Sequence, residues 1–174
     1  LIHIAEGVDQ TSLNEFNALR NISTDPDCLI VDHTTIIHGT ALTNVERQIM
    51  ADNGMSMSWS PKSNVFLYGL GVDLTKTNDI PAALGMGINV AISPDWALGG
   101  SVNMLDELRY ANLVDDQRFG DILDARPLFE MATINPARAM HLEAFIGSLE
   151  VGKRADLFVL RRIENDPYES LLLA

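Results

Sequence analysis

The stretch that decides the fold is Leu1-Ile2-His3-Ile4-Ala5-Glu6, an apolar run that closes with an imidazole and a carboxylate. Two later runs end in the same way: residues 34–37 lead into His38, and residues 89–92 lead into Ser93-Pro94-Asp95. Short, β-branched apolar runs of this kind favour buried strands. Because the carboxyl ends of parallel strands meet at one edge of a sheet, we expect these polar side chains to converge.

Sequence patterns typical of helices separate the strand-like runs. Asp9 or Thr11 can cap a first helix, and Thr43 with Glu46 forms a Thr-x-x-Glu capping box at the start of a second. The alternation favours an α/β fold with a parallel sheet. We expect strands over residues 1–5, 55–59 and 88–92, strand-like runs within 28–38, a loop over 60–71, and helices over 79–85, 102–113, 122–132 and from Asn135 onward.

The end of the chain has a different pattern. Residues 146–149 and 156–160 read as two short strands joined by Glu150-Val151-Gly152-Lys153. They predict a small appended sheet. We therefore divide the chain into a main unit, residues 1–145, and a terminal unit, residues 146–174.

Composition narrows the classes of partner. The 174 residues include 12 basic and 24 acidic side chains, a formal charge of −12 that disfavours nucleic acid and anionic membrane surfaces. Hydrophobic content of 47% with 21% charge is typical of a globular protein. The single Cys28 excludes an intrachain disulfide and suits the reducing cytoplasm.

The polar strand ends carry residue types suited to metal-dependent hydrolysis. A neutral imidazole such as His3 is a preferred ligand of zinc or iron, and a nearby carboxylate such as Glu6 can move protons. His38 could polarise a substrate, and Asp95 could bind a metal and accept a proton from water. The alternative is a hydrogen-bonded structural histidine with surface carboxylates. We interpret His33 as structural and His141 as a surface residue.

Residues 60–64, Ser-Pro-Lys-Ser-Asn, lie between two of the expected strands. They could form a loop that contacts substrate, or merely a rigid turn. The sequence Gly85-Met86-Gly87 precedes its strand and lacks a suitable third glycine, so a dinucleotide-binding fold is excluded.

Together these segments resemble the metal-dependent amidohydrolase superfamily, in its cytosine-deaminase and chlorohydrolase-like branch. The likeness covers essentially the whole chain, and its pieces occur in family order at residues 3–6, 37–42, 59–69, 93–96, 104–109, 131–137 and 147–157. The resemblance implies a TIM-type (β/α)8 barrel, of which residues 1–145 supply strands five to eight with extra helices. It also implies that residues 146–174 hold part of a small β-sandwich and a tail.

The resemblance also implies roles for single residues. His3 and Asp95 correspond to metal ligands, with Asp95 also the general base. Glu6 corresponds to the acid that moves protons, and His38 to the histidine that polarises the substrate. The implied cofactor is one divalent ion, zinc or iron, and the implied reaction is hydrolysis of a non-peptide carbon–nitrogen bond in a cyclic amidine or related small heterocycle.

Three further residues, Ser63, Asn64 and Trp96, are candidates for substrate binding. The family's strand-one His-x-His pair does not occur among the histidines of this chain. We therefore expect a C-terminal portion of a longer enzyme, inactive alone and paired with a missing N-terminal half or with a second copy of itself. The alternatives are a non-catalytic half-barrel that serves assembly or binding, and a metal-free hydrolase of the same fold.

Overall fold

The computed structural model describes residues 1–173 and confirms an α/β fold built on a parallel sheet. The strands are β1 (Ile2–Ile4), β2 (Thr35–His38), β3 (Ser56–Trp59) and β4 (Asn89–Ile92), in the order β1-β2-β3-β4. Helices connect them: α1 (Gln10–Arg20), α2 (Asn44–Asp52), and then α3 (Pro61–Tyr68) and α4 (Ile80–Gly85) between β3 and β4.

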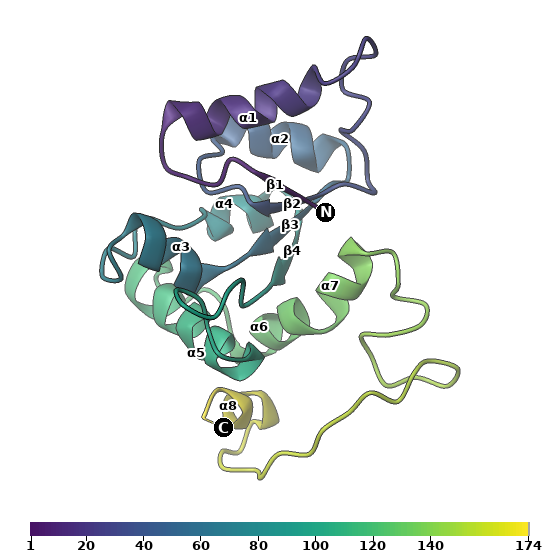
Figure 1. Ribbon diagram of the computed structural model, residues 1–174. Helices are drawn as coiled ribbons and strands as arrows, with labels where there is room; N and C mark the ends of the chain where they lie inside the picture. The colour runs from purple at the N-terminus through teal and green to yellow at the C-terminus, as the bar shows by residue number, and fades with distance from the viewer. Residues whose placement is uncertain (174) are drawn as a thin grey trace.

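Helices dominate the chain after the last strand. They are α5 (Met104–Val114), the π-helical turn η1 (Asp115–Phe119), α6 (Ala125–Ala132), α7 (Ile134–Ala139) and α8 (Pro167–Leu172). Helices α1 and α2 lie next to each other at the β1 end of the molecule, whereas α6 and α7 pack against β4 (Figure 1). The sheet therefore lies inside the molecule, as expected for parallel strands.

The core lies between the sheet and its covering helices. Ile36, Met57 and Val90, one from each of three neighbouring strands, are fully buried and lie in register with one another. Phe16 of α1 and Leu128 of α6 are equally buried. Burial of a large apolar side chain contributes roughly 1.5–3 kcal/mol, so this cluster fixes the register of the sheet.

Two helix starts predicted from the sequence are present in the structure. Thr43 and Glu46 form the capping box of α2, in which the Thr43 amide donates to Glu46 Oε2 at 3.0 Å. Asp9, and not Thr11, caps α1, because its carboxylate accepts the Ser12 amide at 2.9 Å. The strand-proximal ends of both helices are thereby fixed.

The prediction of a loop over residues 60–71 is wrong, because most of this segment forms helix α3. Pro61 occupies the first helical turn, where its fixed φ is favourable and its missing N–H is not needed. Ser60 makes no side-chain cap, and the carboxylate of Glu107 on α5 accepts the Lys62 amide at 3.2 Å instead. Helix α3 thus starts directly at the carboxyl end of β3.

The prediction of two strands at 146–149 and 156–160 is also wrong, since the described residues contain no strand there. This segment runs as extended coil from α7 to α8 (Figure 1). Its backbone hydrogen bonds include Arg154 to Phe145 at 2.9 Å, but no neighbouring strand takes up its remaining groups within residues 1–173. An apolar run needs such a neighbour to become a strand.

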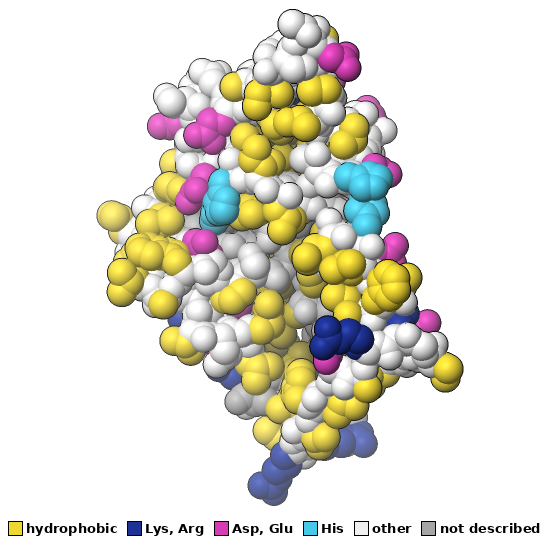
Figure 2. Space-filling view, turned by 45° about the vertical axis from the view of Figure 1, so that its right-hand side comes forward, with side chains coloured by type: hydrophobic (Ala, Val, Ile, Leu, Met, Phe, Trp, Pro, Cys, Tyr) yellow, Lys and Arg dark blue, Asp and Glu magenta, His cyan; other side chains and the backbone are white. Residues whose placement is uncertain are grey.

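Hydrophobic side chains are spread over the face shown in Figure 2. Among the exposed apolar residues, Leu70, Leu98 and Val159 are 88%, 81% and 88% exposed. Single exposed apolar side chains are common on the surfaces of folded proteins. Within the described part of the chain, no helix has the length and apolar content needed to cross a bilayer.

Candidate active site

The backbone turns sharply at the carboxyl ends of three strands. Ala5 follows β1, His38 ends β2 and Asp95 follows β4, and their φ angles are +55°, +66° and +42°. Non-glycine residues rarely adopt this left-handed conformation, which costs roughly 1–2 kcal/mol each. Such strain gathers where side chains are held for function.

The turn at His38 brings two histidines together. His3 pairs in register with Ile37, so a regular strand would point His38 to the opposite face. Because the backbone of His38 is left-handed, its ring lies 5.3 Å from that of His3, centroid to centroid. The amides of Gly39 and Ala41 donate to Ile4 and Ala5, which ties this turn to the end of β1.

The turn at Ala5 brings Glu6 to the same place. The Ala5 amide donates to Glu15 Oε2 of α1 at 2.8 Å, and this bond holds the turn. Glu6 Oε1 then lies 3.5 Å from His38 Nε2. His3, Glu6 and His38 each offer a ligand atom, and the three atoms lie within 4.8 Å of one another.

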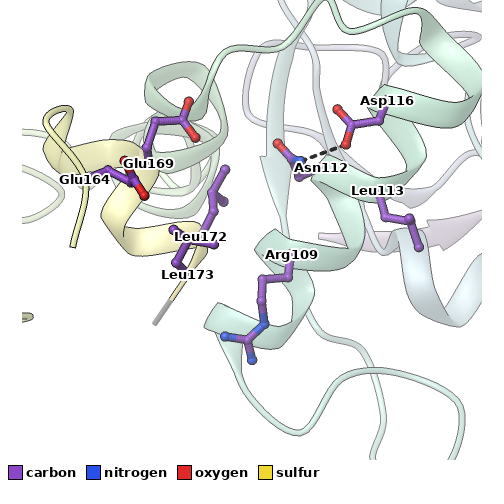
Figure 3. Close-up of a pocket in the computed structure, with 8 residues that line it drawn as sticks. All are labelled: Arg109, Asn112, Leu113, Asp116, Glu164, Glu169, Leu172 and Leu173. Carbon is purple, nitrogen blue, oxygen red and sulfur yellow. Dashed lines mark hydrogen bonds between the residues drawn. The ribbon is translucent and has the colours of Figure 1, made fainter.

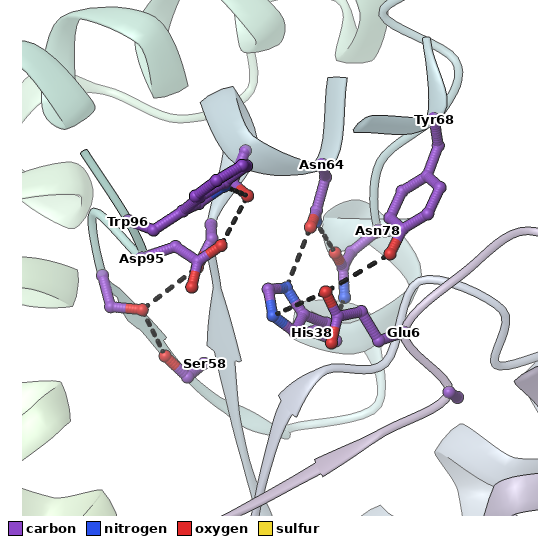
Figure 4. Close-up of polar contacts among 12 residues, drawn as sticks. Glu6, His38, Ser58, Asn64, Tyr68, Asn78, Asp95 and Trp96 are labelled. Atoms are coloured by element: carbon purple, nitrogen blue, oxygen red, sulfur yellow. Dashed lines mark hydrogen bonds and ion pairs between the residues drawn. The ribbon is translucent and has the colours of Figure 1, made fainter. Parts of the chain in front are cut away.

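Two buried amides hold the other side of the His38 ring (Figure 4). Asn64 Oδ1 lies 3.0 Å from His38 Nδ1, and Asn64 Nδ2 donates to Asn78 Oδ1 at 2.7 Å. Asn78 Nδ2 donates in turn to the His38 carbonyl. All three side chains are at least 99% buried, so solvent does not compete for these bonds.

Tyr68, the last residue of α3, completes the surroundings of Glu6. Its hydroxyl donates to Glu6 Oε1 at 3.3 Å. Burial, and then the charge of Glu6, raise the pKa of Tyr68 to about 12. Tyr68 therefore remains a hydrogen-bond donor to Glu6 throughout the physiological pH range.

A second polar group surrounds Asp95. Ser63 Oγ donates to Asp95 Oδ2 at 2.5 Å, and Trp96 Nε1 donates to Ser63 Oγ at 3.2 Å. Ser93 lies two residues before Asp95, and its hydroxyl is 2.9 Å from that of Ser58 at the end of β3. Asp95 and Trp96 themselves are exposed.

The structure thus sorts the predicted residues into two groups at one edge of the sheet. His3, Glu6 and His38 form the first, and Asp95 lies in the second. Within residues 1–173, Asp95 joins no group of three metal-ligating side chains. The first turns of α3 connect the groups, because Ser63 contacts Asp95 while Asn64 contacts His38. The predicted metal pair of His3 and Asp95 stays a prediction.

The sequence patterns did not predict two residues of the site, Tyr68 and Asn78. Tyr68 lies four positions after Asn64, so both project from the same face of α3. Recognition of Pro61 as the start of a helix would have placed Tyr68 at the site. Asn78 lies in the polar stretch before α4, where no sequence pattern distinguishes it from its neighbours.

The remaining histidines lie elsewhere on the surface. His33 stacks on His141 at 4.2 Å between ring centroids, and the rings are within 15° of parallel. His33 Nδ1 contacts Asp32, whose pKa this contact lowers. The prediction of His141 as a surface residue is confirmed. The stacked pair joins the loop before β2 to the end of α7.

Two cavities are found away from the strand ends. One, of about 490 Å³, lies between α5 and the C-terminal segment (Figure 3). Its lining combines Arg109 with the carboxylates of Asp116, Glu164 and Glu169. The other, of about 280 Å³, is lined almost wholly by apolar side chains of α5, α6 and the tail. Neither cavity is lined by a histidine or cysteine, whereas His3 and His38 lie together at the sheet edge.

Comparison with known proteins identifies the family. Residues 10–171 match the sequence pattern of the amidohydrolase family, which is most of the chain. The chain belongs to the amidohydrolase family. The resemblance inferred from the motifs is therefore confirmed.

The relatives of this amidohydrolase include several deaminases. The 5-methylthioadenosine/S-adenosylhomocysteine deaminase of Desulforudis audaxviator is 36% identical over 134 residues, 75% of this chain and 29% of that protein. The human guanine deaminase is 26% identical and matches 94% of this chain and 37% of its own length. The chain thus spans less than two fifths of the length of these relatives.

Two solved enzyme structures share the fold. An adenosine deaminase from Xanthomonas campestris with bound zinc superposes with a TM-score of 0.68 at 26% identity, over 88% of this chain and 35% of that one. A triazine hydrolase variant reaches a TM-score of 0.77 at 23% identity, over 98% of this chain and 39% of that one. The four-stranded parallel sheet with its helices is therefore an arrangement found within larger solved structures.

The donor set of this amidohydrolase chain fits a divalent cation. Two imidazoles and one carboxylate, as offered by His3, His38 and Glu6, are a ligand type that catalytic zinc uses. The buried amide of Asn64 on the far nitrogen of His38 is the kind of outer contact that orients a ligand histidine.

Proposed function

We propose that this chain supplies part of the active site of a metal-dependent hydrolase that removes an amino group from a small heterocycle. The main support for this proposal is that ligand atoms of His3, Glu6 and His38 lie within 4.8 Å of one another at the carboxyl edge of the sheet. Deaminases among the relatives support the reaction class. In this proposal β1 to β4 are strands five to eight of a (β/α)8 barrel, and the missing half comes from an N-terminal portion or a second copy.

The proposed cation, zinc or iron, is held by His3, with Asp95 as a second ligand from the end of β4. The imidazole of His38 and the carboxylate of Glu6 fit the same ion, and anomalous diffraction at the zinc edge distinguishes these two ligand sets. A bound divalent ion would supply Lewis acidity, which lowers the pKa of water toward about 7 and makes it a nucleophile at neutral pH.

Glu6 is the proposed carrier of protons to the departing amine. The Tyr68 hydroxyl occupies Glu6 Oε1, which leaves Oε2 to take up a proton and release it to the nitrogen of the breaking carbon–nitrogen bond. His38 Nε2 lies 3.5 Å from Glu6 Oε1, on the same side of the site. Asp95 is the proposed base that accepts a proton from the attacking water.

The three candidate substrate-binding residues divide by exposure. Ser63 and Asn64 are fully buried, and their polar atoms bind Asp95, His38 and Asn78. We therefore assign Ser63 and Asn64 to the positioning of catalytic side chains. Trp96 is 40% exposed beside Asp95, and its ring is the surface on which a flat heterocycle would stack.

Ammonia release by the complete protein, with chloride release measured for the triazine, tests the proposal. The zinc-loaded and the chelated protein are each incubated with adenosine, methylthioadenosine, S-adenosylhomocysteine, guanine and a chlorinated triazine. Turnover of an aminated substrate by the zinc form alone is expected. Full activity after chelation would favour a metal-free hydrolase, and inertness of the metal-loaded protein toward all substrates would favour a binding module.

The 174-residue chain by itself gives a second comparison. We expect it to be inactive as a monomer, because it supplies only one side of the proposed site. Size-exclusion chromatography with light scattering, performed with and without the N-terminal portion, separates self-association from pairing with that portion. An active monomer of the chain would contradict the proposal that the chain supplies only one side of the active site.

A further inference from the structure

We propose that Asn78, acting through Asn64, fixes the tautomer of His38, so that the proton stays on Nδ1 and the lone pair of Nε2 faces Glu6. Asn78 and Asn64 are positioning residues in this inference, because their side chains contact His38 and not the reacting atoms. The inference deepens the proposed function but stands on hydrogen bonds that do not depend on it.

The orientation of Asn78 is anchored by a backbone carbonyl. Asn78 Nδ2 contacts the carbonyl oxygen of His38. Because a peptide carbonyl only accepts hydrogen bonds, the side chain of Asn78 must present its NH₂ group there. The carbonyl Oδ1 of Asn78 is thereby turned toward Asn64.

The anchored amide fixes the next one. Asn78 Oδ1 lies 2.7 Å from Asn64 Nδ2, and an acceptor at this position requires the NH₂ group of Asn64 to face it. Thr77 Oγ1 is a second neighbour of that NH₂ group at 3.5 Å, and it accepts from Trp59 Nε1 at 2.8 Å. Asn64 Oδ1 is consequently left to face His38.

The second amide fixes the imidazole. Asn64 Oδ1 is an acceptor 3.0 Å from His38 Nδ1, so Nδ1 must carry the proton. Neutral histidine has one N–H, and Nε2 then holds a free lone pair. His38 is 1% exposed, Asn64 0% and Asn78 1%, so a flipped amide would leave buried polar groups unpaired.

This tautomer has a consequence for the other side of the ring. His38 Nε2 faces Glu6 Oε1 at 3.5 Å, and that oxygen already accepts from Tyr68. A lone pair and a carboxylate oxygen repel unless a proton or a cation lies near both. The fixed Nδ1–H tautomer, which we call the lock on His38, therefore leaves Nε2 able to accept a proton or to bind a metal. A neutral His38 in this tautomer cannot donate a hydrogen bond from Nε2 to a substrate.

The tautomer can be read directly by NMR. The ¹⁵N shifts of the His38 ring are recorded in the metal-free full chain at a pH where the ring is neutral, and they are assigned by comparison with His38→Gln. We expect protonated Nδ1 and unprotonated Nε2. An Nε2–H tautomer in the unaltered protein would overturn the inference, whatever the enzymatic activity.

Substitution of Asn78 tests its part in the lock. In Asn78→Ala the amide of Asn64 is free to flip, and the Nδ1–H form is expected to fall to a mixture of both tautomers. Asn78→Ser makes the same comparison if the alanine variant fails to fold. Zinc affinity, measured with zinc alone, is expected to weaken about 10–100-fold. An unchanged Nδ1–H tautomer in a folded variant would overturn the role of Asn78.

A second substitution should rescue the tautomer. A carboxylate has no donor, so Asn64→Asp combined with Asn78→Ala should restore the Nδ1–H form without Asn78. Asn89→Ala is the matched control, since Asn89 also makes two side-chain hydrogen bonds at the sheet, to Ser56 and Asn135, and should leave His38 unchanged. Absence of deamination would refute the proposed function alone, whereas failure of this rescue would refute the lock alone.

Discussion

Ser63 Oγ lies 2.5 Å from Asp95 Oδ2, a hydrogen bond that joins the first turn of helix α3 to the loop after β4, 32 positions away. The next residue along the helix, Asn64, binds His38 at the end of β2. One turn of α3 thus positions side chains at two separated strand ends. Helix α3 therefore holds the two groups of site residues in place relative to each other.

Removal of the Ser63 hydroxyl should weaken catalysis by the complete enzyme. A hydrogen bond to a charged group contributes about 1.5–3 kcal/mol, so Ser63→Ala should lower kcat/KM about 10–100-fold if Asp95 is catalytic. Ser56→Ala is the control, because Ser56 is a buried serine at the opposite end of β3. Equal effects of the two substitutions would remove Ser63 from the site.

Glu6→Gln should separate catalysis from metal binding. The amide keeps the size of the side chain but cannot carry a proton to the departing amine, and loss of such transfer costs about 10²–10⁴-fold in rate. We expect kcat to fall by this amount while zinc content, measured by elemental analysis, is retained. Glu143→Gln changes an exposed glutamate and should be silent.

A large loss of zinc from Glu6→Gln would instead identify Glu6 as a ligand. Full activity of the variant would show that another group moves the proton. The steady-state rate and the zinc content together therefore distinguish the three outcomes.

His3→Ala should reduce zinc content more than any substitution of an outer residue. Loss of a ligand is expected to exceed the roughly 10–100-fold change in affinity typical of outer contacts. His33→Ala is the matched control, because His33 stacks on His141 away from the site. If His33→Ala lost as much zinc as His3→Ala, the metal site would have been misplaced.

Glu107 should make stability fall as pH rises from the acidic range. Burial raises the pKa of this carboxyl above 4.5, so its contribution is fully present below the unfolded pKa and is lost as pH rises through the folded pKa. Glu107→Gln keeps an acceptor for the Lys62 amide and removes the charge. Urea unfolding from pH 4.5 upward should show a flatter profile for the variant, and an unchanged slope would contradict this assignment.

Much of the fold followed from local sequence patterns. The capping box of Thr43 and Glu46 and the apolar run that became β4 both depend on residues close together in sequence. These local preferences agree with the global structure, and this agreement allows the elements to be predicted from the sequence.

The missed features depend on partners far away in the sequence. Helix α3 has no side-chain cap of its own and uses Glu107 of α5. Asn78 contacts a backbone carbonyl 40 positions earlier. The apolar runs at 146–149 and 156–160 have strand-like composition, but composition does not supply the neighbour that a strand needs.

The central claim, that the ends of these strands hold a divalent cation, is tested most directly by anomalous diffraction at the zinc edge. Crystals of the zinc-loaded complete protein should show a peak about 2.0–2.1 Å from a ring nitrogen of His3, and the position of the peak shows whether Asp95 or the pair of Glu6 and His38 completes the site. A peak only at His33 and His141, or none in active crystals, would contradict the account.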